Sequence, residues 1–100
     1  MAALWAAVAE DLKKDWTLEE LAHRCHCSAE HLRRLCLREL GRSPMQHLTS
    51  LRMDRARRLL ETTRDKLEVI AGEVGYANAG IFCRVFKRWV GVAPGSYRGE

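Results

Sequence analysis

Arginine is the residue type in this sequence best suited to binding chemistry, because it supplies thirteen of the seventeen cationic side chains. Four arginines fall within residues 28–42 against two acids, and four more within residues 52–58 against one acid. A guanidinium group stays charged at neutral pH and donates paired hydrogen bonds to phosphates and to planar acceptors. The net charge is +4, and residues 1–50 contribute none of it. Arginines grouped in this way favour a polyanionic partner.

A second group of reactive side chains lies at residues 23–27, which read His-Arg-Cys-His-Cys. Zinc sites usually combine a C-x2-C or H-x3–5-H pair with a distant second pair, and this chain lacks that arrangement. Cys25 falls on the apolar side of an expected helix and Cys27 matches Tyr76 of the second copy, so both are predicted to be small hydrophobes flanking the turn. We expect no metal and no cofactor. A cysteine-based redox or metal sensor remains an alternative function.

Other function classes find no support in the sequence. There is no Gly-rich phosphate loop, no plausible Ser/His/Asp set and no carboxylate pair on one helix face, so we do not expect an enzyme. No apolar run approaches the ~18–20 residues of a membrane span. With 47% hydrophobic and 30% charged residues, the composition is that of a globular protein, and we expect it in the cytoplasm.

Helix signals recur along the chain, and no stretch alternates apolar and polar residues for long enough to form a strand. Thr17-Leu-Glu-Glu20 and Ser43-Pro-Met-Gln46 resemble capping boxes, and Ser28 and Asn78 are typical N-caps. Asp65 is expected to open another helix. The side chains expected to face the core are Trp5, Trp16, Leu18, Leu21, Ala22, Cys25, Leu32, Leu35, Cys36, Leu40, Leu48, Leu51, Ala56, Leu59, Leu60, Leu67, Ile70, Ala71, Val74, Tyr76, Phe82, Val85, Phe86, Trp89 and Tyr97.

The same supersecondary unit occurs twice. A shift of 49 aligns Leu18, Leu21, Ala22 and Cys25 with Leu67, Ile70, Ala71 and Val74. A shift of 50 aligns Ser28, Leu32, Arg34, Gly41 and Pro44 with Asn78, Phe82, Arg84, Gly91 and Pro94. Each copy is a short helix, a tight turn and a longer arginine-bearing helix, which is the outline of a helix-turn-helix. His26 takes the turn position of Gly75, so local strain is expected there.

The predicted fold is all-α, with about seven helices including one over residues 4–12. Residues 1–100 are expected to form a single domain: a first helix-turn-helix unit (1–43), a linker helix (44–63) and a second unit (64–100). A straight helix from Pro44 to Thr62 spans ~28 Å. Successive major-groove faces of B-DNA lie ~34 Å apart. One chain could therefore hold two recognition helices in adjacent major grooves.

From Thr17 to Arg98 the chain resembles the DNA-binding domain of the AraC/XylS family of bacterial transcription regulators. The most specific stretches are Ile70-Ala-Gly-Glu-Val-Gly-Tyr76 and Phe82-Cys-Arg-Val-Phe-Lys-Arg-Trp-Val-Gly-Val-Ala-Pro-Gly-Ser-Tyr-Arg98. The resemblance implies seven helices, two helix-turn-helix units and binding to double-stranded promoter DNA. It also implies an effector or dimerisation domain in a missing N-terminal part. RNA polymerase is a further expected partner of an activator, and a helical protein-interaction module is the alternative.

In this family the first recognition helix, here residues 28–40, reads bases from its exposed positions. Carried over, these are Glu30, Arg33 and Arg34, with Ala29, His31 and Arg38 as auxiliary contacts. The chemistry is suitable, because arginine bonds guanine O6 and N7 and glutamate accepts from cytosine N4. Ordinary solvation is the competing explanation for Arg33 and Arg34, and a favourable helix-dipole interaction is that for Glu30.

The second recognition helix, residues 78–90, departs from the family pattern. Asn78 is followed by Ala79, Gly80 and Ile81, whose side chains cannot exchange a hydrogen bond with a base. Arg84 and Lys87 remain as contacts, and Ile81 or Ala79 can still touch a thymine methyl group. We therefore expect the first unit to carry most base readout and the second to anchor on phosphates. The arginines of residues 52–58 are expected to be mainly structural or solvated.

Overall fold

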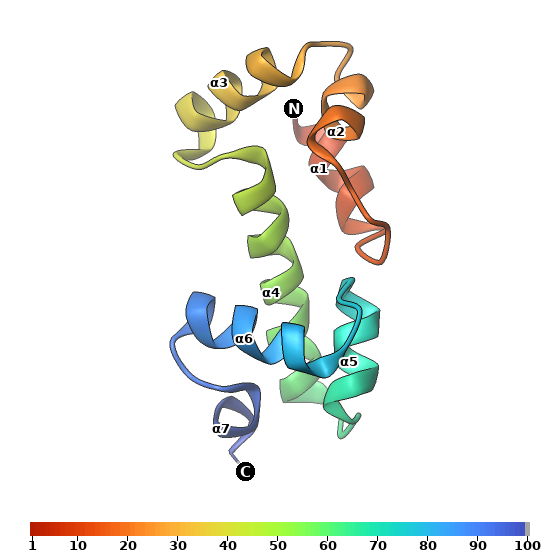
Figure 1. Cartoon of the computed structure of the whole chain (residues 1–100), viewed down its shortest axis with the longest axis vertical. Helices are drawn as coiled ribbons and strands as arrows, with labels where there is room; N and C mark the ends of the chain where they lie inside the picture. The colour runs from red at the N-terminus through yellow and green to blue at the C-terminus, as the bar shows by residue number, and fades with distance from the viewer. Residues whose placement is uncertain (100) are drawn as a thin grey trace. The chain divides into compact units, whose positions relative to one another are not determined.

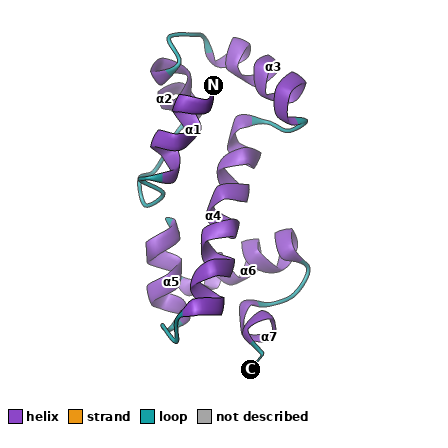
Figure 2. Ribbon diagram, turned by 180° about the vertical axis from the view of Figure 1, so that it is seen from behind, coloured by secondary structure: helices purple, strands orange, loops and turns teal. Residues whose placement is uncertain are grey.

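The computed structural model describes residues 1–99, which fold into seven α-helices and contain no strand (Figures 1 and 2). The helices are α1 (Ala2–Ala9), α2 (Leu18–Arg24), α3 (Ala29–Leu40), α4 (Pro44–Thr62), α5 (Leu67–Val74), α6 (Ala79–Val90) and α7 (Pro94–Arg98). This confirms the all-α class and the seven predicted helices. The first helix ends earlier than predicted, because residues 10–13 form turns. No helix of the described chain is long and apolar enough to cross a membrane.

The chain divides into two compact units with a boundary inside α4, unit 1 (Met1–Leu51) and unit 2 (Arg52–Glu100). Each unit has its own buried apolar cluster. In unit 1 the cluster is Leu4, Trp5, Val8, Leu12, Trp16, Leu21, Ala22, Leu32, Cys36 and Leu48. In unit 2 it is Met53, Ala56, Leu60, Ile70, Ala71, Val74, Phe82 and Phe86. Each helix-turn-helix is therefore held by a core within its own unit.

Side-chain caps fix the starts of four helices. The Thr17, Ser28 and Asn78 oxygens accept the backbone N–H groups of Glu20, His31 and Ile81 at 3.1, 3.0 and 2.9 Å. Ser43 and Gln46 form the reciprocal capping box: the Ser43 N–H donates to Gln46 Oε1 at 2.8 Å, and the Gln46 N–H donates to Ser43 Oγ at 3.2 Å. These caps satisfy N–H groups that a helix leaves unpaired at its start, so they define where the helices begin.

The predicted start of α5 is wrong. Its N-cap is Lys66, which makes no side-chain cap, and Asp65 stays in the preceding loop. Two long-range bonds explain this: Arg98 Nη1 donates to the Asp65 carbonyl at 2.8 Å, and Arg98 Nε donates to the Leu60 carbonyl at 3.3 Å. The C-terminal helix thus fastens the loop in which an N-cap was expected.

The prediction that Trp89 belongs to the core is also wrong, because its side chain is 39% exposed. The inward positions of α6 are Phe82 and Phe86, both fully buried, and the next inward position is Val90, which packs against the same cluster. These three residues follow a spacing of four, which leaves Trp89 on the outer side of the last turn.

The turns of the two helix-turn-helix units repeat in atomic detail. The Cys27 N–H donates to the Ala22 carbonyl at 3.1 Å, and the Tyr76 N–H donates to the Ala71 carbonyl at 2.8 Å, one repeat later. The residue directly before each donor has a left-handed backbone conformation, with φ of 54° at His26 and 102° at Gly75. His26 is the one non-glycine residue with positive φ within residues 1–99, which is the physical form of the local strain predicted there.

Replacing His26 by glycine is expected to stabilise unit 1. A left-handed conformation costs a residue with a Cβ about 1–2 kcal/mol, whereas glycine loses about 0.5–1 kcal/mol through its greater freedom when unfolded. The free energy of unfolding should therefore rise by up to about 1 kcal/mol in chemical denaturation. The converse change Gly75→Ala should lower it. A lower unfolding midpoint for His26→Gly would contradict the strain assigned to this turn.

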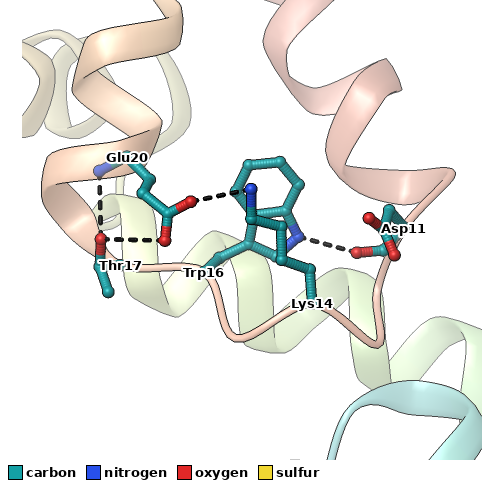
Figure 3. Close-up of polar contacts among 5 residues, drawn as sticks. All are labelled: Asp11, Lys14, Trp16, Thr17 and Glu20. Carbon is teal, nitrogen blue, oxygen red and sulfur yellow. Dashed lines mark hydrogen bonds and ion pairs between the residues drawn. The ribbon is translucent and has the colours of Figure 1, made fainter.

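The connection from α1 to α2 is fastened around the buried Trp16 (Figure 3). The indole N–H donates to the Asp11 carbonyl at 2.8 Å, and the Lys14 ammonium lies 4.6 Å from the indole centroid. Lys14 Nζ is also 2.8 Å from Glu20 Oε2 (Figure 3). The hydrogen bond from Lys14 is the main cause that lowers the pKa of the Glu20 carboxyl. These contacts hold the loop after α1 together and tie it to the first turn of α2.

Candidate nucleic-acid interface

The second helices of the two helix-turn-helix units, α3 and α6, bury equivalent positions and expose equivalent positions. Leu32 and Cys36 of α3 are fully buried, as are Phe82 and Phe86 at the same places in α6. Each helix therefore turns a matching surface away from the core of its unit. Of the predicted DNA contacts, Glu30, His31, Arg33, Arg34, Arg38, Asn78, Gly80, Arg84 and Lys87 are exposed, and Ala29, Ala79 and Ile81 are half-buried.

The exposed surface of α3 combines two loosely paired arginines with one that has no ion pair. Arg33 Nη1 lies 3.0 Å from Glu30 Oε2, and Arg38 Nε lies 3.5 Å from Glu39 Oε1. Exposed pairs of this kind contribute only about 0.2–1 kcal/mol, so they can be exchanged for other partners at little cost. Within residues 1–99, Arg34 forms no ion pair, which leaves its guanidinium available to an external acceptor.

The exposed surface of α6 has fewer hydrogen-bonding side chains than that of α3. The Asn78 side-chain oxygen is occupied by the Ile81 N–H, and a Cβ added at Gly80 would lie 3.3 Å from that oxygen. Glycine at this position therefore leaves the cap uncrowded. Arg84 and Lys87 are exposed and form no ion pair with any other described residue. The surface of α6 is thus basic along its later turns and apolar in its first turn.

A contact that sequence reasoning missed holds the turn between α5 and α6. The Arg52 guanidinium lies over the Tyr76 ring, 5.5 Å from its centroid. Burial is the main cause that raises the pKa of Tyr76. The two residues are far apart in the chain and follow no periodicity, so no sequence signal connects them. With Arg57 bound to Asp54 at 3.3 Å, two of the four arginines of residues 52–58 have structural roles, as predicted.

One of the four cysteines, Cys36, is buried, and the other three are half-buried. Cys25 and Cys27 are half-buried against the unit 1 core, and the buried Cys36 thiol donates to Met1 Sδ at 3.6 Å. All four cysteines of the chain are free thiols. Burial raises the pKa values of Cys25, Cys36 and Cys83, which disfavours the reactive thiolate. Residues 1–99 contain no group of three or more side chains placed to hold a metal ion.

Comparison with known proteins finds a matching family and related transcriptional regulators. A family described as "Helix-turn-helix domain" matches residues 21–100. The chain is 34% identical over 92 residues to an HTH-type transcriptional regulator of Haemophilus influenzae, and 38% identical over 79 residues to the regulator Rv1931c of Mycobacterium tuberculosis. These alignments cover 92% and 79% of this chain. The chain spans about a third of the length of these relatives, 31% and 30%.

Solved structures give the same result. The DNA-binding domain of AdpA, a global transcriptional factor solved in complex with a target DNA, is 31% identical with a TM-score of 0.91. That match covers 98% of this chain and 88% of the other. The C-terminal domain of AraT, a response regulator from Geobacillus stearothermophilus, is 34% identical with a TM-score of 0.90, over 97% of this chain and 81% of that one.

Proposed function

Because the chain belongs to the AraC-type helix-turn-helix family of DNA-binding domains of transcriptional regulators, we propose that it binds a specific promoter sequence through α3 and α6. The observation that carries this proposal is the pair Arg34 and Arg84. They occupy equivalent positions of the repeat, both are exposed, and neither is in an ion pair within the described residues. The complex of the similar AdpA domain with its target DNA supports the same partner here.

In this proposal the two units contribute differently to DNA binding, one mainly through base contacts and the other mainly through phosphate contacts. In α3, Glu30, Arg33 and Arg34 supply groups that match cytosine N4 and guanine O6 and N7, so unit 1 carries most of the base readout. In α6, Arg84 and Lys87 contact phosphates, together with the backbone N–H groups at the helix start. Ala29, His31, Arg38 and Asn78 are auxiliary contacts, chiefly to the backbone.

The proposed site is a long asymmetric one. The 19 residues of α4 make a helix of ~28 Å, close to the ~34 Å between successive major-groove faces. On that basis α3 and α6 occupy adjacent major grooves of one duplex. An effector or dimerisation domain is a further proposed part of the whole regulator, because this chain spans only 31% of the length of the Haemophilus relative. RNA polymerase is a further proposed partner of a regulator that activates transcription.

Selection of bound duplexes from a random library of about 30 base pairs tests the proposal directly. We expect two enriched blocks about 10 base pairs apart, one strong and one weaker. Binding should also fall steeply as salt rises, because phosphate contacts release counterions. Binding without any enriched sequence would refute specific readout, and failure to bind duplex DNA at any salt would refute the function itself.

A further inference from the structure

The first turn of α6 differs chemically from that of α3 at the positions that face away from the core. Under the 50-residue repeat, Glu30 is replaced by Gly80, and His31 is replaced by Ile81. The hydrogen-bonding side chains that α3 has at these two positions are therefore absent from α6. Asn78 lies before these two positions, at the N-cap, where its side-chain oxygen accepts the Ile81 N–H at 2.9 Å and its amide NH2 group remains a donor.

Ile81 is an apolar side chain at the start of α6 that does not belong to the buried cluster of unit 2. It is half-buried, but it is not among the side chains of the described chain that pack against the buried cluster of unit 2. The half-buried side chains that do so include Tyr76, Cys83, Val85 and Val90. Part of the isoleucine surface thus remains in water at the start of a helix whose next turn carries Arg84.

An apolar surface is selective in the major groove. Thymine alone presents a methyl group there, whereas the other three bases present only donors and acceptors at the same edge. Covering a polar edge with an isoleucine removes its water without replacing the hydrogen bond, which is unfavourable. Contact between the same side chain and a methyl group is favourable, because it removes apolar surface from water on both sides.

We infer that unit 2 recognises a thymine through the C5 methyl group, with Ile81 as the contacting side chain. The inference rests on the proposed function and specifies the readout of the weaker half-site. Unit 2 then discriminates by an apolar contact at a single base pair, while Arg84 and Lys87 hold the helix on phosphates. Removing one buried methyl group should weaken binding about fourfold.

The test uses the wild-type chain and a duplex obtained by the selection above. The block that loses its preference in Arg33→Ala belongs to α3, so the other block belongs to α6. Each thymine of the α6 block is replaced in turn by deoxyuridine, which lacks the methyl group and keeps all hydrogen-bonding groups. We expect one position at which the dissociation constant rises about fourfold. Equal binding of every deoxyuridine duplex would overturn the inference while leaving DNA binding intact.

An Ile81→Ala variant identifies the contacting side chain. Alanine is a good helix former, so α6 should remain folded, and the variant should bind the thymine and deoxyuridine duplexes equally. Val69→Ala is the matched control: it removes the same kind of surface from a valine of α5 that is 48% exposed, and it should keep the fourfold difference. A preference for thymine that persists in Ile81→Ala would overturn the assignment to Ile81. Absence of any duplex binding by the wild type would instead overturn the proposed function.

Discussion

Replacing Arg33 by alanine is expected to reduce binding to the selected duplex far more than binding to random DNA. The Arg33 side chain is half exposed, and its one ion pair within residues 1–99 is with Glu30 at 3.0 Å, so it can leave that carboxylate for a guanine. A bidentate arginine–guanine contact discriminates by about 1–3 kcal/mol, which corresponds to roughly 5- to 150-fold in affinity. The measurement is the ratio of the two dissociation constants at one fixed salt concentration.

Two companion variants separate recognition from charge. Arg33→Lys keeps the cation but loses the paired donors, so it should also lose most of the preference for the selected site. Arg84→Ala removes one charge from α6 and should weaken both duplexes by the same factor, with a salt dependence reduced by about one phosphate contact. Equal losses on selected and random DNA from Arg33→Ala would contradict its role as a base reader.

Local signals in the sequence predicted most of the fold. Ser43 and Gln46 specify a capping box within four residues, and the structure contains both of its hydrogen bonds. The internal repeat predicted local strain at His26, because Gly75 takes the same place in the second copy, and the structure shows a left-handed backbone there. These features are set by interactions between near neighbours in the chain, so they can be recognised without knowing the tertiary structure.

The features that were missed depend on residues distant in sequence. Asp65 is kept in a loop by Arg98, and Arg52 lies over Tyr76. The Tyr97 hydroxyl donates to Glu61, which is the main cause that raises the pKa of Tyr97. Periodicity alone also could not place Trp89 outside the core, since that depends on how far the core extends along α6.

The sequence predicted which side of each helix faces outward, but not what the side chains on it are bound to. The repeat assigned the exposed faces of α3 and α6 correctly, and it identified Arg34 and Arg84 as equivalent. It could not reveal that Arg33 is bound to Glu30, whereas the N-cap predicted at Asn78 is present in the structure. Which bases these side chains read remains a prediction, because it depends on the DNA as well as on the chain.

Replacing Phe86 by alanine is expected to lower the free energy of unfolding more than the other changes considered. The loss of stability should be confined to unit 2. Phe86 is fully buried, and its ring centroid lies 5.7 Å from that of Phe82 and 5.5 Å from that of Tyr97. It therefore joins α6 to α7. A buried Phe→Ala change costs about 3–5 kcal/mol, a large part of the 5–15 kcal/mol that stabilises a typical domain. Phe86→Leu, which keeps most of the apolar volume, should cost much less.

Amide hydrogen exchange can locate this loss, because it reports opening segment by segment. Unit 1 has a separate buried cluster, so protection should fall in α5 and α6 and persist in α2 and α3. Binding should change accordingly: the variant should keep the preference of the α3 block and lose affinity contributed by the α6 block. Equal loss of protection in both helix-turn-helix units would show that they unfold as one cooperative body. In that case the uneven division of DNA recognition could not be tested by disrupting one core, and the surface variants of Arg33 and Arg84 would be the discriminating ones.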